Sequence, residues 1–303
     1  MTSPSTHPAP ATHEGRAPFT YDGATYETYY KVFGDLRAPH AAPPVLVAHG
    51  GPGMTHDYLL PHADLAAAGA HPRAVVFYDQ IGNGRSSRRP DAPKAFWTVD
   101  LFLDELESLL AHLGVADGFD MVGHSWGGMM ASELVVRRHP KGLRRLVIAD
   151  SPASVALWGQ SFMQLLGEFP EEVQATVKAG EEKDLKAYRE AVFKVYAVYG
   201  LRIQPFPQEF LTTLEYRYGD DADRTVPNAG ILSGWTVIDR LKDVDVPTLV
   251  INGAFDIAQD WVVEAYHKNI PGAKWVKFEN SSHLPCWEER EEYMKTIASF
   301  LEA

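Results

Sequence analysis

The sequence predicts an α/β protein whose core is a mostly parallel, doubly wound sheet. Short apolar runs typical of buried strands alternate with helical segments in the first half of the chain, and this alternation returns near its end. Between these two parts, residues 152–238 contain no apolar run of the buried-strand kind. They have instead the pattern of helices rich in aromatic residues.

The first part opens with an aromatic and β-branched stretch, residues 25–32, which predicts a strand. Four apolar runs have the pattern of strands buried in a parallel sheet: residues 44–48, 73–79, 119–122 and 143–149. Between them we predict two helices: residues 99–113, with leucines on one face, and residues 128–136.

The helical stretch interrupts the sheet. An insertion of this size between two strands predicts a cap over the carboxyl edge, where α/β proteins place their sites. The last part adds strands at 247–252 and 274–278, a helix at 261–269 and a closing helix from residue 288. The expected domains are a core of residues 18–151 and 239–303, a helical cap of residues 152–238 after the sixth strand, and a mobile tail, residues 1–17.

Composition narrows the classes of partner. The net charge of −12 argues against nucleic acid and against an anionic membrane surface. The single cysteine, Cys286, excludes an intramolecular disulfide and fits a reducing compartment. No apolar run is long enough to span a bilayer, and the N-terminus shows no signal-peptide pattern. We therefore expect a cytoplasmic protein with a small-molecule substrate, while its oligomeric state stays open.

The chemistry centres on residues 123–127, with the sequence GHSWG. A short apolar run precedes this pentapeptide and a helical pattern follows it, which is the context of a nucleophile elbow. The small residues let the backbone pass closely through a sharp turn. Ser125 is therefore predicted to be a nucleophile. The alternative is a serine in an ordinary glycine-rich turn, which would not explain the suitably placed acid and histidine described next.

A serine nucleophile needs a base, and the base needs an orienting acid. Asp256 lies just beyond one predicted strand and His283 just beyond the next. The order Ser, Asp, His is that of the α/β-hydrolase arrangement, in which the sheet brings the three residues together. The alternatives are a helix-capping acid for Asp256 and a turn histidine for His283.

The loop at residues 49–53, with the sequence HGGPG, is where we expect the remaining catalytic element, a site for the negative oxygen formed in the reaction. Glycines after a strand let backbone N–H groups converge on a negative oxygen, so we expect an oxyanion hole made by the N–H groups of Gly51 and Trp126. His49 is expected to brace this loop rather than act as a base. The scattered His56, His62 and His71 form no metal-ligand spacing, so neither a metal nor another cofactor is predicted.

These motifs resemble the proline iminopeptidase (prolyl aminopeptidase) branch of the α/β-hydrolases. The resemblance covers roughly residues 18–303. It rests on residues 49–60, 77–80, 82–86, 123–128 and 281–285, with Trp287 and Glu288. It implies an eight-stranded core with a helical cap, and an acyl-enzyme mechanism without a cofactor.

Two positions depart from that family. Its aminopeptidases bind the substrate's free amine with acids, one after a Pro-Asn pair and one directly after the catalytic aspartate. Here those positions hold Ala229 and Ile257. An ammonium group in a closed pocket without a counter-charge is costly to desolvate. These two residues, with Trp158 and Trp235, are expected to line an apolar substrate pocket, although the two tryptophans could equally be cap core.

The resulting expectation is a serine hydrolase that cleaves a small amide, ester or lactone. Two alternatives stay open at this point. One is a true N-terminal proline aminopeptidase whose amine-binding acid has moved elsewhere in the cap. The other is a cyclase, lyase or binding module on the same fold. The acids that could substitute are Glu209, Glu215, Asp220, Asp221 and Asp223.

Overall fold

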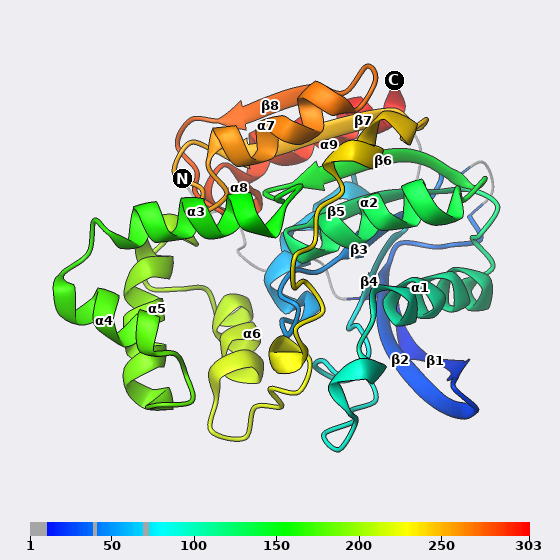
Figure 1. The fold of residues 1–303 in the computed structure, drawn as a ribbon. Helices are drawn as coiled ribbons and strands as arrows, with labels where there is room; N and C mark the ends of the chain where they lie inside the picture. The colour runs from blue at the N-terminus through cyan, green and yellow to red at the C-terminus, as the bar shows by residue number, and fades with distance from the viewer. Residues whose placement is uncertain (1–10, 39–40, 69–72) are drawn as a thin grey trace.

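The computed structural model describes residues 11–38, 41–68 and 73–303. Their strands form one sheet in the order β1-β2-β4-β3-β5-β6-β7-β8, drawn in Figure 1. β1 and β2 are antiparallel to their neighbours, and the other six strands run parallel. This confirms the mostly parallel, eight-stranded sheet. The strands are β1 (His13–Tyr21), β2 (Ala24–Phe33), β3 (Val45–Ala48), β4 (Val75–Tyr78), β5 (Phe119–His124), β6 (Leu143–Ala149), β7 (Thr248–Gly253) and β8 (Lys274–Phe278).

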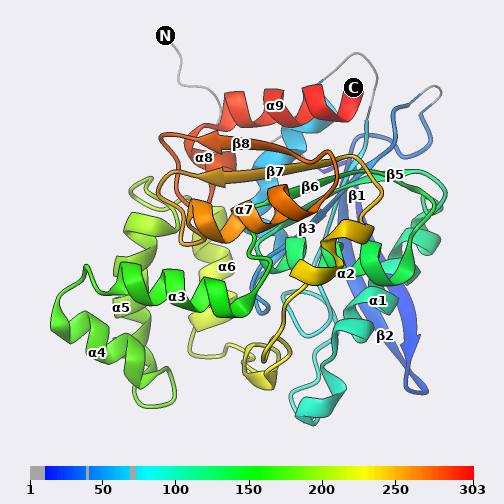
Figure 2. The ribbon, with the colours of Figure 1, turned by 45° about the horizontal axis from the view of Figure 1, so that its top comes forward.

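The central strands are apolar because both faces of the sheet are covered. Leu46 and Met121 belong to one hydrophobic cluster, while their neighbours Val47 and Val122 belong to the other. Figure 2 shows α9 on one side of the sheet, with α1, α2 and α7 on the other. The first cluster includes side chains of α1 (Val99–Leu113), α2 (Trp126–Arg138) and α7 (Asp260–Asn269). The second includes side chains of α9 (Arg290–Glu302) and of the 3-10 helix η1 (His56–Ala66).

Four α-helices follow β6 before β7 begins. They gather beyond the carboxyl ends of the parallel strands, as Figure 1 shows, and α6 packs against η1. We call residues 152–238 the helical insertion. Its position is consistent with the expected cap. The helices are α3 (Val155–Leu166), α4 (Glu171–Ala179), α5 (Leu185–Tyr199) and α6 (Gln208–Tyr218), followed by the short η3 (Pro227–Ala229) and η4 (Ile238–Asp243).

The expected tail is wrong over its last residues. β1 begins at His13 and pairs with β2 along its whole length, from His13 with Val32 to Tyr21 with Ala24. Residues 1–10 of the expected tail lie outside the described residues. The strand escaped prediction because it is an edge strand: only Ala17 and Phe19 are buried, and it contains a glycine and a proline.

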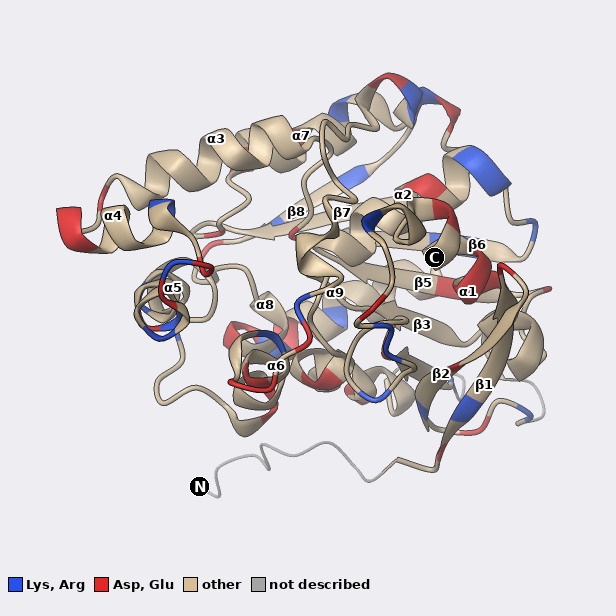
Figure 3. Cartoon of the chain, turned by 60° about the horizontal axis from the view of Figure 1, so that its bottom comes forward, with Lys and Arg blue, Asp and Glu red and all other residues tan. Residues whose placement is uncertain are grey.

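Two whole-chain features bear on partners. Within the described residues, no helix has both the length and the apolar character needed to cross a membrane. The acidic residues are spread over several elements, including α1, α4 and α6, and basic residues are interspersed on α5 and α6 (Figure 3). The net charge of −12 is therefore not concentrated on a single element.

Candidate active site

The sheet order brings the predicted site residues to one edge. β3, β5, β6, β7 and β8 are consecutive parallel neighbours, so their carboxyl ends lie side by side. Gly51 follows β3, Ser125 follows β5, Asp256 follows β7 and His283 follows β8. The sheet therefore collects residues that are far apart in the sequence, at the edge where α/β folds place their sites.

Ser125 occupies a strained turn between β5 and α2. Its φ of 54° and ψ of −120° lie in a region that non-glycine residues rarely adopt. The close packing of the turn explains why glycines flank Ser125. A Cβ on Gly123 would lie 2.5 Å from the carbonyl oxygen of Gly127, and a Cβ on Gly127 would lie 2.2 Å from the carbonyl oxygen of Ala48. This confirms the predicted elbow. It also places Ser125 at the N-terminus of α2, the positive end of the helix dipole.

His283 and Asp256 are in direct contact. The Nδ1 of His283 lies 2.5 Å from Oδ1 of Asp256, which also accepts a hydrogen bond from the N–H of Ala258 at 2.8 Å. A carboxylate at Nδ1 fixes the tautomer in which Nδ1 carries the proton, so Nε2 of the neutral ring is free to accept one. Ser125 and His283 line the same pocket.

The loop that carries His283 is tied to the short helix α8 (Pro285–Glu288) and the residue after it. The N–H of Ser282 donates to Glu288 at 2.5 Å, and the hydroxyl of Ser281 donates to Glu289 at 2.7 Å. The carboxylates of Glu288 and Glu289 thus hold the loop in place. This explains why Glu288 belongs to the same motif as His283.

His124 takes part in a network that the sequence did not reveal. Its Nε2 donates to the carbonyl oxygen of His283 at 2.8 Å, so its Nδ1 accepts from the hydroxyl of Tyr58 at 2.7 Å. That hydroxyl in turn accepts the N–H of Gly50 at 2.7 Å. Burial lowers the pKa of His124 well below its ordinary value, which keeps the ring neutral. Because the N–H of Gly50 is donated to Tyr58, the next backbone N–H of the loop that could serve in an oxyanion hole is that of Gly51.

His49 braces the glycine loop, as expected. Its Nδ1 donates to the carbonyl oxygen of Gly50 at 2.9 Å, and its Nε2 accepts the backbone N–H of Gln80 at 3.0 Å. The side chain of Gln80 donates to the carbonyl oxygen of His49 and accepts the indole N–H of Trp126 at 2.7 Å. Burial lowers the pKa of His49 to about 4. This network joins the loop after β3 to the start of α2.

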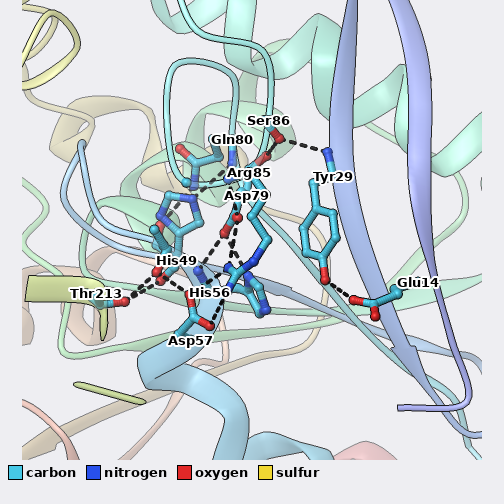
Figure 4. Close-up of polar contacts among 12 residues, drawn as sticks. Glu14, Tyr29, His49, His56, Asp57, Asp79, Gln80, Arg85, Ser86 and Thr213 are labelled. Atoms are coloured by element: carbon cyan, nitrogen blue, oxygen red, sulfur yellow. Dashed lines mark hydrogen bonds and ion pairs between the residues drawn. The ribbon is translucent and has the colours of Figure 1, made fainter. Parts of the chain in front are cut away.

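A second polar cluster lies behind the loop, shown in Figure 4. Asp79 accepts from the backbone N–H and from Nδ1 of His56, and from the backbone N–H of Arg85. The guanidinium of Arg85 forks onto Asp57 at 2.9 and 3.0 Å. His56, Asp57 and Asp79 lie close enough to share a cation. The two carboxylates already contact the guanidinium of Arg85, and Asp79 also accepts from Nδ1 of His56, so we assign the cluster a structural role. His71 lies outside the described residues.

The pocket at the sheet edge has a volume of about 520 Å³. Gly51, Ser125, Trp158, Ile257 and His283 line it, as expected. None of the described residues that line it is Asp, Glu, Lys or Arg. The remaining lining is mostly apolar or aromatic and includes Met54, Tyr58, Met129, Phe162, Tyr188, Val192, Tyr196, Phe210 and Tyr218.

Two expected lining residues lie elsewhere. Trp235 donates its indole N–H to Glu133 on α2 at 2.8 Å, so the ring is anchored to the core and not to the pocket. Ala229 packs against the first hydrophobic cluster and does not reach the pocket either. Both residues are in the segment that leads from α6 back to the sheet. An aromatic or apolar residue there can face the core as readily as the pocket.

None of the five acids considered as substitutes lines the pocket. Glu181, between α4 and α5, is close enough to act electrostatically on Tyr188 and Tyr218 of the aromatic wall, and the sequence did not single it out. It pairs with Arg217 at 2.8 Å, and Arg217 also lies over the ring of Tyr218. The other carboxylate oxygen of Glu181 is buried and has no hydrogen-bond partner among the described residues.

Comparison with known proteins agrees with this geometry. The family model of the alpha/beta hydrolase fold matches residues 43–290. Together with the strand order and the serine elbow, this match makes the chain an α/β hydrolase.

The relatives define the family more narrowly. The chain is 35% identical to the proline iminopeptidase of Thermoplasma volcanium over 283 residues, which is 90% of this chain and 92% of that protein. A crystal structure of the proline iminopeptidase of Mycobacterium smegmatis matches with a TM-score of 0.81 and 36% identity, over 96% of this chain and 98% of that one. The crystal structure of VinJ matches with a TM-score of 0.88 and 40% identity, over 97% and 99%. The chain belongs to the proline iminopeptidase family and is a hydrolase.

Proposed function

We propose that the protein is a serine hydrolase that cleaves a small, neutral amide, ester or lactone through an acyl-enzyme on Ser125. One observation carries the proposal: Ser125 and His283 open into a pocket whose described lining has no charged carboxylate or cationic side chain. The proposed reaction follows from Ser125 and His283, and the proposed substrate class follows from the uncharged residues that line the rest of the pocket.

The reaction proceeds in two halves. In the first, Nε2 of His283 takes the hydroxyl proton of Ser125 while Oγ attacks the substrate carbonyl. The imidazolium is held by Asp256 at Nδ1. It then gives its proton to the leaving amine or alcohol as the C–N or C–O bond breaks. In the second half, water attacks the ester carbonyl on Ser125 while His283 accepts a proton from the water. His283 then returns this proton to Oγ of Ser125 as the ester C–O bond breaks and the acid leaves.

The negative oxygen of each tetrahedral intermediate is stabilised by the backbone N–H groups of Gly51 and Trp126. Two contacts support this assignment. The N–H of Gly50 is already donated to Tyr58, which leaves Gly51 as the donor from the loop. Trp126 is the first residue of α2, where backbone N–H groups have no acceptor within the helix.

The pocket wall favours substrates without a free ammonium group. Ile257 lines the pocket directly after Asp256 and is only 4% exposed, so the position that carries an acid in the resembling aminopeptidases is apolar and closed here. Desolvating a charged amine against such a wall is unfavourable. Trp158 and Phe162, stacked with ring centres 5.3 Å apart, add a flat apolar surface suited to an acyl or aryl group.

The competing function is an N-terminal proline aminopeptidase, since the relatives are named proline iminopeptidases. One feature favours it: a buried oxygen of Glu181 has no hydrogen-bond partner in the described parts of the chain and lies close to the tyrosines of the pocket wall. Its carboxylate, however, is already paired with Arg217. A substrate ammonium would have to compete with a guanidinium for the same charge.

The deciding experiment compares kcat/KM for prolyl naphthylamide and for its N-acetylated form. We expect the acetylated substrate to be cleaved at least as well as the free amine. An aminopeptidase would prefer the free amine by roughly 30-fold or more, because losing a buried charged contact costs about 2–5 kcal/mol. Glu181→Gln is measured beside Glu182→Gln, an exposed neighbour in the same loop. A strong free-amine preference that only Glu181→Gln abolishes would overturn our substrate assignment.

A further inference from the structure

Asp150 lies directly after β6, between the strand that leads to Ser125 and the strand that leads to Asp256. Its backbone N–H donates to the carbonyl oxygen of Ile251 at 2.7 Å, and its φ of 53° is in the left-handed region. Its side chain is completely buried. The strained backbone of Asp150 thus places its carboxyl group inside the protein, at the edge of the sheet where Ser125 and Asp256 lie.

Three carboxyl oxygens at this place have no hydrogen-bond donor among the described residues: both oxygens of Asp150, and Oδ2 of Asp256. The other oxygen of Asp256 already accepts from His283 and from the N–H of Ala258. One carboxyl oxygen of Asp150, one of Asp256 and a ring nitrogen of His283 lie within 4.8 Å of one another. The carboxyl groups of the two acids are therefore neighbours, and each has at least one oxygen without a donor among the described residues.

Two adjacent buried carboxyl groups cannot both be ionised, because like charges at this distance repel strongly in a low dielectric. One proton between them relieves the repulsion and supplies the missing donor. Asp256 already accepts two N–H groups at Oδ1, from His283 and from Ala258. The backbone N–H of Gly253 near Asp150 favours its ionised form, although neither oxygen of Asp150 accepts a hydrogen bond from the described residues. Burial and the charge of Asp256 outweigh this N–H and raise the pKa of Asp150 well above its ordinary value.

We propose that Asp150 is a positioning residue, protonated at neutral pH, whose carboxyl O–H donates a hydrogen bond to Oδ2 of Asp256. This inference rests on the proposed function, in which Asp256 orients His283. With Oδ1 held by His283 and Oδ2 held by Asp150, the carboxylate of Asp256 cannot rotate about its terminal bond. The ring of His283 keeps its orientation in consequence. A neutral Asp150 also adds no second negative charge beside the imidazole.

The other titratable groups around Asp150 are consistent with a neutral acid. His124 presents Nε2 at 4.0 Å, but this ring is kept neutral by burial. Glu288, Cys286, Tyr58 and Tyr293 face the same region from α8, η1 and α9. None of these residues brings a fixed positive charge that would stabilise an ionised Asp150.

The test compares Asp150→Asn with Asp150→Gly. Asparagine has the same shape, tolerates left-handed φ and can donate its amide N–H to Asp256. Glycine tolerates the same φ but leaves Oδ2 without a donor. We expect Asp150→Asn to lose no more than about threefold in kcat, and Asp150→Gly to lose roughly tenfold or more with little change in KM. Equal losses in the two variants would overturn the proposal.

The acid limb of the pH profile gives a readout that a merely structural role would not move. If Asp150 were ionised at neutral pH, Asp150→Asn would remove a negative charge beside His283 and shift the acid limb of kcat/KM to lower pH. The proposal predicts no shift in that limb. A clear downward shift would show that Asp150 carries the charge, which contradicts the proposal.

A second measurement does not depend on activity. Infrared difference spectra at neutral pH, wild type minus Asp150→Asn, should contain the carbonyl band of a protonated carboxylic acid. Subtracting the variant removes any other buried protonated acid, such as Glu105, whose pKa is raised by burial to about 8. An absent band would overturn the proposal even if Ser125 is the nucleophile. A present band with full turnover by Ser125→Ala would instead contradict only the proposed function.

Discussion

At the scale of single residues, the proposed mechanism assigns one shared proton transfer to Ser125 and His283. Their contributions to the rate should therefore not add. We expect Ser125→Ala and His283→Ala each to reduce kcat by roughly 10⁶, and the double variant to be little worse than either. Steady-state kinetics with an acetylated prolyl ester measure all three. Losses that multiply in the double variant would mean that the two side chains act in separate steps.

Which site residues can be predicted from sequence depends on how each one is positioned. Ser125, Asp256 and His283 each follow a strand in a fixed order, so the sheet alone determines that they meet. Trp235 was misplaced because the fate of an aromatic ring is decided by tertiary partners, here Glu133. Asp150 also follows a strand. However, its role depends on the unpartnered oxygens of Asp256, which only packing reveals.

At the scale of elements, the serine elbow depends on glycines that allow close approach. A Cβ on Gly127 would lie 2.2 Å from the carbonyl oxygen of Ala48, which is backbone and cannot move aside. We expect Gly127→Ala to lower the free energy of unfolding by about 1–3 kcal/mol or more, which is the usual cost of overpacking in a core. Urea denaturation measures this change.

The matched control is Gly159→Ala in α3. A Cβ at that position meets nothing within 4 Å, and the residue is helical. Alanine should therefore be neutral or stabilise the protein by up to about 1 kcal/mol. If Gly127→Ala proved as stable as Gly159→Ala, the elbow would not be the tightly packed turn described here.

The elements themselves were predictable where a periodic apolar signal was strong. α1 begins and ends where the leucine pattern places it, and β6 and β8 match their apolar runs. β1 was missed because an edge strand buries little and so has a weak pattern. The 3-10 helix η1 contains a proline and lacks the regular apolar spacing of an α-helix, so no helical pattern indicates it in the sequence.

At the scale of the whole molecule, several buried histidines make stability depend on pH. Burial lowers the pKa of His49 and His62 to about 4, below the unfolded value near 6.5. The unfolded chain therefore binds more protons between pH 6.5 and 4, and each histidine's contribution to stability is lost as pH falls through that window. Glu105 acts with the opposite sign, because its folded pKa is raised to about 8.

A single variant isolates the histidine contribution. His62 does not line the pocket, and it bonds to the carbonyl oxygen of Leu59 and the hydroxyl of Tyr293. We expect the stability advantage of wild type over His62→Asn to shrink by about 1.4 kcal/mol per pH unit between pH 6.5 and 4. Urea denaturation at several pH values measures this difference. A difference that is constant with pH would mean that His62 titrates alike in the folded and unfolded chains.

The most direct test of the central claim is covalent labelling of the nucleophile. A fluorophosphonate reacts with a serine only where a base and an oxyanion hole activate it. We expect intact-protein mass spectrometry to show one adduct per chain, peptide mapping to place it on Ser125, and hydrolytic activity to fall in proportion to labelling. Ser125→Ala and His283→Ala should remain unlabelled. Labelling at another serine, or full activity in a protein phosphonylated on Ser125, would contradict the account.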